Sequence, residues 1–411
     1  MTEGPYKLPE GWRWVRLGEI AWRESVTLKP SDYPDLVFRY LGMEHVAPGQ
    51  WDEPMPVEIP GREIKSQVIV YRPGLILYGK LRPYLNKVVV PSTEGVASTE
   101  FVPIAVNEKV VESHYLAAYL RSPAFVAYAT QNTTGSRQPR VRLDALWNAL
   151  IPLPPLEEQR RIVARVEELM SRIREAKRLR QEAKEEAERL WQSILSETFP
   201  KPGSELPKGW RWVRLGDVCE YRTGIWGPEA SDPTQGFPII RSTEIEGLLI
   251  RPQTASVRMV RRGQVDAYKL ETGDILINKS SGSPHLVGWP AIFEDPRDGK
   301  IYLFSNFMLR LRADRRTLEP WFLLYYLHSP TARSIYLGAQ DTTSGLRNLR
   351  VREFMVQPIP LPPLEEQRRI VAYLQDVQGK IRALKEVQAQ TEAELKRLEQ
   401  AILDKAFRGE L

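Results

Sequence analysis

Two segments of the chain carry apolar residues that recur alternately every third and fourth position. In residues 156–199 the series includes Ile162, Val166, Leu169, Ile173, Leu190 and Ile194. In residues 361–411 the same spacing includes Ile370, Leu374, Val377, Ile381, Leu384, Leu395, Leu398 and Ile402. A repeat of 3.5 residues keeps one seam of a helix facing a partner helix. The pattern predicts two long helices that pair along these residues, and the alternative is that each helix packs on its own domain.

The two helical segments belong to a tandem repeat. Residues 8–19 return with few changes as residues 206–217, and residues 153–164 return letter for letter as residues 361–372. Even the polar interruption of the seam recurs, as Arg180 in one copy and Gln388 in the other. A tandem repeat predicts a pseudo-twofold assembly within one chain. We expect globular domains at residues 1–152 and 200–360, kept apart by antiparallel helices at residues 153–199 and 361–411.

Between the repeated motifs the pattern changes to short apolar runs separated by turn residues. Residues 75–78, 87–90, 101–104, 274–278 and 307–311 are typical of strands. Short helices are expected at residues 115–120 and 321–327, each followed by a Ser-Pro pair, Ser122-Pro123 and Ser329-Pro330. Each repeat is therefore predicted to be an α+β domain with a mixed sheet.

The turns of both domains contain basic, amide and small hydroxyl side chains suited to a polyanion. Such residues reach phosphates and base edges of nucleic acid. Residues 78–87 have no close counterpart in the second repeat and are favoured for sequence-specific contacts, whereas residues 133–142 and 342–352 resemble each other and favour a backbone-positioning role. A solvated surface role is the alternative for any single arginine. The candidate DNA-binding residues are Tyr78, Lys80, Arg82, Tyr84, Lys87, Arg137, Gln138, Arg140, Arg241, Lys279, Ser280, Ser283, Arg347, Asn348 and Arg350.

Charge and motif content narrow the function. The net charge is +6, and the excess lies almost wholly in residues 200–360, which is compatible with nucleic acid without being diagnostic. The sequence has neither a Gly-rich phosphate loop nor a G-x-G-x-x-G turn, and its four histidines lack metal-ligand spacing. The single cysteine, Cys219, excludes an internal disulfide. We therefore expect a binding protein without catalytic residues, metal or cofactor of its own, located in the cytoplasm and without a membrane partner.

The repeated motifs resemble a known family. Leu-Pro-x-Gly-Trp-x-Trp-x-x-Leu-Gly-Asp/Glu at the start of each repeat, and Pro-Leu-Pro-Pro-Leu-Glu-Glu-Gln-Arg-Arg-Ile-Val at its end, resemble the specificity subunits of type I restriction-modification systems. The resemblance covers the whole chain. It implies two target recognition domains that each bind one half of a bipartite double-stranded DNA sequence, and two helices that set the spacer between the halves.

The same resemblance implies partner proteins. Modification (methyltransferase) subunits, two for each chain, would dock on the repeated frame and carry S-adenosylmethionine, while restriction subunits would bring ATP and Mg²⁺. Two other hypotheses remain open at this point. One is a scaffold that does not bind DNA, and the other is a self-sufficient DNA-modifying enzyme with unrecognised motifs.

Overall fold

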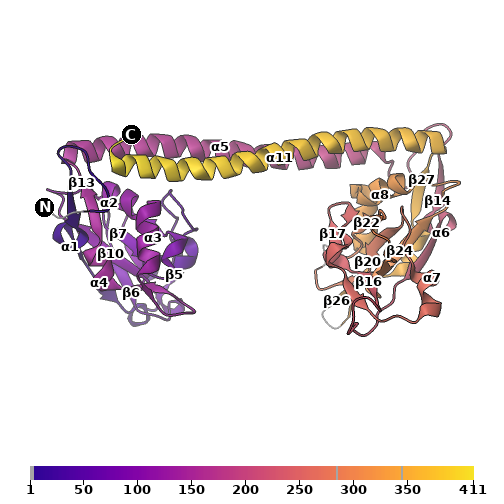
Figure 1. Ribbon diagram of the computed structural model, residues 1–411, viewed down its shortest axis with the longest axis horizontal. Helices are drawn as coiled ribbons and strands as arrows, with labels where there is room; N and C mark the ends of the chain where they lie inside the picture. The colour runs from indigo at the N-terminus through magenta and orange to yellow at the C-terminus, as the bar shows by residue number, and fades with distance from the viewer. Residues whose placement is uncertain (1–3, 284–285, 344–345) are drawn as a thin grey trace. The chain divides into compact units, whose positions relative to one another are not determined.

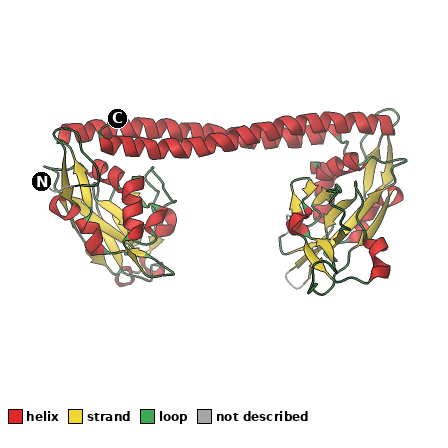
Figure 2. Ribbon diagram, in the orientation of Figure 1, coloured by secondary structure: helices red, strands yellow, loops and turns green. Residues whose placement is uncertain are grey.

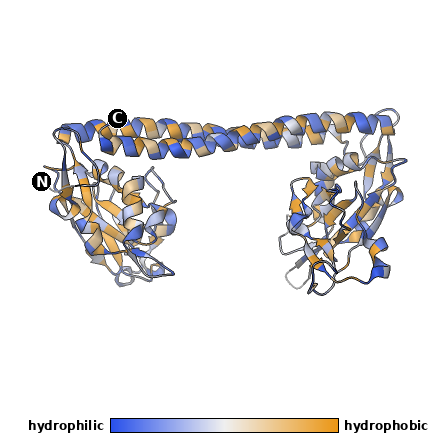
Figure 3. Cartoon of the chain, viewed as in Figure 1, coloured by the Kyte–Doolittle hydropathy of each residue, from blue (hydrophilic) through white to orange (hydrophobic). Residues whose placement is uncertain are grey.

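The computed structural model describes residues 4–283, 286–343 and 346–411. The chain divides into two compact units: unit 1 is Met1–Gln181 with Val387–Leu411, and unit 2 is Glu182–Glu386. Both boundaries fall within the long helices α5 (Leu156–Thr198) and α11 (Leu364–Arg408). Each unit therefore consists of a globule and one segment of each long helix. Polar and apolar residues alternate along both helices (Figure 3).

Within each unit the segments of α5 and α11 lie side by side and run antiparallel (Figure 1). In unit 1 the bonding partners of α5 lie earlier in the chain as α5 advances. Arg161 donates to the carbonyl of Leu411, just after α11 (3.1 Å), whereas Lys177 and Arg180 pair on α11 with Glu399 (2.8 Å) and Glu392 (3.6 Å). In unit 2, Lys385 pairs with Glu188 at 3.2 Å. The predicted antiparallel pairing is confirmed. At the polar interruption of the seam, the Arg180 guanidinium donates to the backbone carbonyl of Gln388.

The predicted seam residues differ in burial. Ile162, Val166, Ile173, Leu374 and Ile402 are buried, whereas Leu169, Ile194, Ile370, Val377, Ile381 and Leu395 are partly buried. The seam prediction is wrong for three other residues, because Leu190, Leu384 and Leu398 are 54%, 43% and 49% exposed. Two helices alone enclose only part of a seam. In unit 2 the buried face of α5 packs on the globule instead, through Trp191 and Leu195, and Phe199 just after the helix joins the same core.

The globule of unit 1 contains two larger sheets (Figure 2). One has the order β2-β10-β7-β8, formed by Ala21–Arg23, Phe101–Val106, Ile76–Gly79 and Val88–Val89. The other has the order β3-β6-β9-β4-β5, formed by Val26–Leu28, Val68–Tyr71, Gly95–Ser98, Val37–Leu41 and Val57–Pro60. Helices α2 (Ser113–Leu120), α3 (Pro123–Gln131) and α4 (Leu143–Asn148) belong to the same globule. One apolar core joins the β2-β10-β7-β8 sheet, α2 and both long helices.

Unit 2 has related elements and a larger first sheet. Its order is β15-β24-β20-β22-β18-β17, formed by Cys219–Thr223, Met308–Ala313, Ile275–Asn278, Pro290–Ile292, Leu249–Ile250 and Ile245–Glu246. A second sheet, β19-β16-β23, is formed by Ser256–Arg258, Phe237–Ile240 and Leu303–Phe304. Helices α8 (Pro320–His328), α9 (Pro330–Gly338) and α10 (Val351–Val356) correspond in order to α2, α3 and α4. The α+β prediction is confirmed in both units.

The motifs that open and close each repeat pair with each other. Strand β1 (Arg13–Arg16) is antiparallel to β13 (Leu150–Leu153), with Arg13 opposite Leu153. Strand β14 (Arg211–Arg214) is antiparallel to β27 (Pro358–Leu361), with Arg211 opposite Leu361. The register is the same in both units. The opening and closing motifs are therefore alike in the two repeats because they form the same two-stranded sheet at the base of each globule.

A buried glutamine joins each long helix to its globule. In unit 1 the Gln159 side chain is fully buried, accepts from the Glu112 amide (2.8 Å) and donates to the carbonyls of Val110 and Pro154 (both 2.9 Å). In unit 2, Gln367 accepts from the Glu319 amide (2.8 Å) and donates to Thr317 (2.9 Å) and Pro362 (2.8 Å). Since buried amides require partners, these bonds account for the glutamine in the doubled Leu-Glu-Glu-Gln motif.

An aromatic contact fixes the far end of each long helix. Phe407 of α11 packs edge-to-face on Tyr115 (5.5 Å between ring centroids) and Tyr119 (5.0 Å) in unit 1. Phe199, just after α5, packs in the same way on Phe322 (5.4 Å) and Tyr326 (5.6 Å) in unit 2. Each globule is thus bound by the start of one long helix and the end of the other.

The strands and short helices predicted from the sequence are confirmed, but the prediction for the Ser-Pro pairs is incomplete. They do not only end a helix, because α3 and α9 begin at Pro123 and Pro330. Ser122 accepts from the Phe125 amide (3.3 Å) and Ser329 from the Ala332 amide (3.2 Å). Serine at the N-cap followed by proline at the first helical position is a start signal.

Candidate nucleic-acid interface

In unit 1 a basic loop follows the buried strand β7. The Lys80 amide donates to the Glu100 carbonyl (3.0 Å), and the loop then forms a single 3₁₀ turn, η4 (Pro83–Leu85). Arg82 and Asn86 flank this turn, and both have a left-handed φ of 51°. Such a conformation costs a non-glycine residue on the order of 1–2 kcal/mol. Strained backbone of this kind persists only where the surroundings impose it, and it gathers at functional sites.

Hydrogen bonds hold this loop in place. The Arg82 amide donates to the Pro139 carbonyl at 2.7 Å, and the Asn86 side chain donates to the Arg121 carbonyl at 2.9 Å. Pro139 lies in the hairpin formed by β11 (Thr133–Thr134) and β12 (Arg140–Val141). In the same hairpin, the Val141 amide donates to the Lys80 carbonyl at 3.0 Å. Two stretches that are distant in sequence, residues 80–87 and 133–141, therefore form one structure, which we call the loop–hairpin cluster.

Three of the predicted basic residues bind groups of unit 1 itself and are only partly exposed. Arg140 binds Glu100 through two hydrogen bonds, from Nε (3.0 Å) and Nη2 (2.9 Å). The Lys80 ammonium donates to the Thr99 carbonyl (2.7 Å), and the Lys87 ammonium donates to the Met43 carbonyl (2.7 Å). The Arg140 guanidinium lowers the pKa of Glu100, so this carboxylate is charged at neutral pH. Burial lowers the pKa of Lys87.

The outer surface of the cluster belongs to other residues. Arg82, Arg137 and Gln138 are exposed, and the Tyr84 side chain is 51% exposed. The prediction for Tyr78 is wrong, because this residue is only 4% exposed and its ring packs edge-to-face on Phe125 at 5.8 Å. Tyr78 lies on a strand whose residues are all buried, so it cannot reach a ligand on the surface.

Unit 2 contains an equivalent cluster, which corrects the expectation that residues 78–87 have no counterpart. Strand β20 leads to Lys279, whose amide donates to the Phe307 carbonyl and whose carbonyl accepts from the Leu349 amide, both at 2.8 Å. Lys279 therefore occupies the position of Lys80. Leu349 ends β26 (Leu346–Leu349), which forms a hairpin with β25 (Gln340–Thr343). The backbone hydrogen bonds show that Lys80 and Lys279 are equivalent, although the side chains around them differ.

The remaining predicted residues of unit 2 differ in exposure. Arg347 is exposed, whereas Lys279, Ser280, Ser283 and Asn348 are partly buried, and the Ser280 hydroxyl donates to Asn348 Oδ1 at 2.5 Å. Arg350 donates to the Gly338 carbonyl (2.7 Å) and pairs with Glu353 (2.8 Å). Arg241 pairs with the fully buried carboxylate of Glu244 at 2.9 Å. Pro284, His285, Ser344 and Gly345, which belong to the predicted loops, lie outside the described residues.

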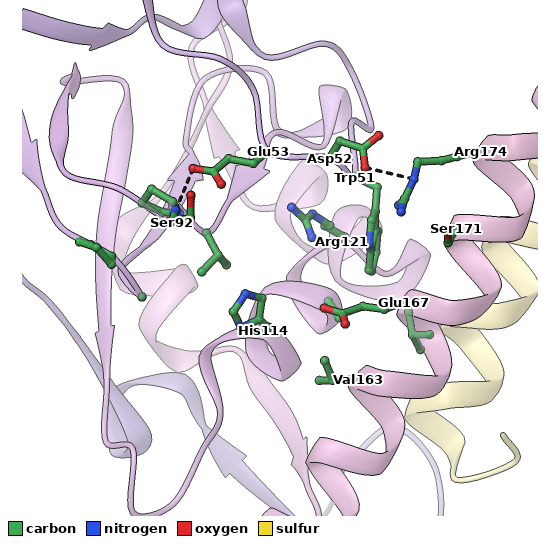
Figure 4. A pocket seen from close by; sticks show the side chains of 16 residues that line it. Trp51, Asp52, Glu53, Ser92, His114, Arg121, Val163, Glu167, Ser171 and Arg174 are labelled. Carbon is green, nitrogen blue, oxygen red and sulfur yellow. Dashed lines mark hydrogen bonds and ion pairs between the residues drawn. The ribbon is translucent and has the colours of Figure 1, made fainter. Parts of the chain in front are cut away.

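A polar cleft of about 650 Å³ lies between the globule of unit 1 and α5 (Figure 4). Arg121 and Arg174 lie on either side of the Trp51 ring, with the Arg121 guanidinium 4.7 Å from the ring centroid and Arg174 paired with Asp52 at 3.1 Å. Glu53, His114 and Glu167 also line it. Hydrogen bonding to Glu112 raises the pKa of His114. Acidic and basic groups balance here, so the cleft lacks the uniform charge of a phosphate site.

The described residues do not form other chemical centres. Within the described ranges, no three His, Cys, Asp or Glu side chains are grouped to hold a metal ion. Cys219 is buried, and burial raises the pKa of its thiol to about 12, so it does not have the character of a reactive cysteine. None of the described helices combines the length and the apolar character that crossing a bilayer requires.

Residues 84–185 and 207–394 match the family described as "Type I restriction modification DNA specificity domain". The chain is 23% identical to the type I restriction enzyme EcoKI specificity subunit of Escherichia coli over 74% of its length, and 29% identical to the EcoDI specificity subunit of Escherichia coli over 50%. It spans 67% of the first relative and only 44% of the second.

Two solved structures are similar along the whole chain. One is a chain from a study of complex assembly and conformational transition of the type I R-M system, with 37% identity, a TM-score of 0.80, and coverage of 99% of this chain and 100% of that one. The other is the HsdS subunit from Thermoanaerobacter tengcongensis, with 39% identity, a TM-score of 0.58 and complete coverage of both chains (100%).

Proposed function

This chain belongs to the family of type I restriction-modification specificity subunits, and from that premise we propose that each of its loop–hairpin clusters reads one half of a bipartite DNA target. The sequence-specificity role is shared by the whole family, which is non-catalytic. The observation that supports the proposal is the recurrence of the cluster: Lys80 and Lys279 hold equivalent positions at the ends of buried strands, each beside a hairpin.

The chemistry of the exposed side chains suits contact with duplex DNA. Arg82, Tyr84, Arg137 and Gln138 of unit 1, and Arg347 of unit 2, lie on the outside of the clusters. Arginine and glutamine read base edges in the major groove, and arginine also binds phosphates. The cationic groups of Lys80 and Arg140 are instead bound within the unit, by the Thr99 carbonyl and the Glu100 carboxylate.

Selection from a duplex pool with randomised positions tests this proposal. The full chain, alone and with the proteins that co-purify with it, should enrich duplexes carrying two fixed half-sites separated by unspecified base pairs. Arg82→Ala should weaken binding by about 1–3 kcal/mol and relax one half-site if Arg82 contacts a base. If it contacts a phosphate, all sequences should weaken equally and the salt dependence should decrease. The control is Arg13→Ala, an exposed arginine on β1. Absence of any enriched sequence would refute the proposal.

We also propose that the reaction is carried out by partner proteins. Two modification subunits per chain, with S-adenosylmethionine, would methylate DNA, and restriction subunits with ATP and Mg²⁺ would cleave it. The helix pair would dock these partners and set the number of unspecified base pairs. Adding seven residues to both long helices should lengthen the spacer and leave the half-sites unchanged, as methylation mapping can measure.

The two alternatives are not favoured. A scaffold that never touches DNA would need neither exposed arginines on a strained loop nor the same loop–hairpin arrangement in both units. A self-sufficient enzyme is opposed by the family, whose role is recognition. Methyl transfer to duplex DNA by the purified chain alone would reverse that conclusion.

A further inference from the structure

Glu100, Arg140 and Gln138 form a chain of hydrogen bonds that ends at the surface of unit 1. Glu100 accepts from Arg140 Nε and Nη2, at 3.0 Å and 2.9 Å. Arg140 Nη2 also donates to Gln138 Oε1 at 3.4 Å, and Nη1 donates to the Gln138 carbonyl at 3.5 Å. A guanidinium has five N–H donors in a fixed plane, so one arginine can hold a carboxylate on one edge and an amide on another.

This arrangement determines which atoms Gln138 offers to a ligand. Its amide oxygen already accepts from Arg140, whereas its amide nitrogen has no acceptor among the described residues. The side chain is exposed on the outer surface of the cluster. The bond therefore favours the orientation in which Gln138 presents its N–H donors outwards over the one in which it presents its oxygen.

We propose that Gln138 is a specificity-determining residue that selects a base with acceptor atoms in the major groove, guanine or thymine. Guanine presents N7 and O6 and thymine presents O4, whereas cytosine presents the donor N4–H₂. A free glutamine favours adenine, because its amide accepts from N6 and donates to N7. The bond from Arg140 turns the amide oxygen towards the guanidinium, so the two-bond pair with adenine is disfavoured, and adenine then offers only N7 beside its N6–H₂ donor. Glu100 is then a positioning residue that acts through Arg140.

Unit 2 does not repeat this chain of bonds among its described residues. The residue that occupies the position of Glu100 is Phe307, since each accepts the amide of the lysine that follows the buried strand. A phenyl ring cannot hold an arginine as a carboxylate does. The half-site read by unit 2 should therefore be indifferent to changes in the Glu100 chain, and it serves as the control within the same molecule.

The inference rests on the proposed function, and one experiment separates the two. Duplexes bound by the full chain are selected from a randomised pool, for the wild type and for Gln138→Ala. The substitution should remove the preference at one position of one half-site, which in the wild type is guanine or thymine by on the order of tenfold. If the wild type enriches no sequence, the proposed function fails. If it enriches a bipartite sequence that Gln138→Ala leaves unchanged, only this inference fails.

Two further variants test the orientation of the amide. Gln138→Glu replaces the outward donors by an acceptor, so the preference at that position should change to cytosine or adenine. Arg140→Met frees the amide, so the position should come to accept adenine. If Arg140→Met abolishes recognition of the whole half-site because the hairpin no longer forms, the result with the surface variant Gln138→Glu alone tests the orientation of the amide. Adenine at this position in the wild type would overturn the inference.

Discussion

Removal of the buried glutamine of the repeated motif should detach a long helix from its globule. Gln159→Leu keeps the approximate size of the side chain and removes three hydrogen bonds, one to the Glu112 amide and two to the carbonyls of Val110 and Pro154. A buried N–H left without a partner costs about 1–3 kcal/mol, and each carbonyl adds less because it has a second lone pair. We expect the free energy of local opening in unit 1 to fall by about 2–4 kcal/mol.

Hydrogen exchange measured by mass spectrometry reports this change directly. The Glu112 amide should exchange roughly 30 to 700 times faster in Gln159→Leu, which is the same loss expressed as a rate. Gln367→Leu should have the same effect on the Glu319 amide of unit 2 and none on Glu112, since it makes the equivalent bonds. Gln400→Leu, an exposed glutamine on α11, is the control. Wild-type exchange at Glu112 in Gln159→Leu would refute the assigned role.

Three other predictions concern stability. Burial lowers the pKa of His328 to about 4 from 6.5, so between these pH values the folded state of unit 2 binds fewer protons than the unfolded state. The free energy of unfolding of unit 2 should therefore fall by about 3 kcal/mol as the pH drops from about 6.5 to about 4. His328→Gln should remove this pH dependence from the unfolding curves. Phe407→Ala should destabilise unit 1 by about 3–5 kcal/mol in urea unfolding, while Phe199→Ala should do so in unit 2. Ile173→Asp places a charge in the core that α5 and α11 share with the globule of unit 1, so the helix content measured by circular dichroism should decrease. Unchanged helix content would contradict that packing.

The long helices and strands could be predicted because their signals are local. A 3.5-residue apolar period sustained over many turns is typical of paired helices, and short apolar runs bounded by turns indicate strands. The burial of individual seam residues could not be predicted. The periodicity says that one face is apolar, but it does not say that Trp191 would meet the Tyr325 ring at 5.8 Å, while Leu190 beside it stays exposed. That outcome depends on what the globule offers to the helix.

The candidate site could be predicted only in part, for a related reason. The residues of the loop and of the hairpin are recognisable separately, but nothing in the sequence joins them, because their bonds cross more than fifty positions of the chain. Glu100 was missed altogether. A carboxylate repels a polyanion, so the sequence does not indicate it as a DNA-binding residue. Its role follows only from its two hydrogen bonds to Arg140. Tyr78 was a candidate because it begins the basic segment at residues 78–87, yet its strand is buried on both faces.

The location of the repeated residues accounts for how the two units can share a frame and differ in what they read. The repeated motifs form the β1–β13 and β14–β27 pairs and the glutamine contacts at the base of the globules, and the aromatic contacts of Phe407 and Phe199 are equivalent in the two units. Within each cluster the loop and the hairpin are joined by backbone hydrogen bonds, such as those of Lys80 and Lys279, which do not depend on which side chains the surface carries. Side chains on the cluster surface can therefore change without loss of the fold. Exchanging exposed residues between the clusters should alter the half-site that is read and leave unfolding curves within about 0.5 kcal/mol of the wild type.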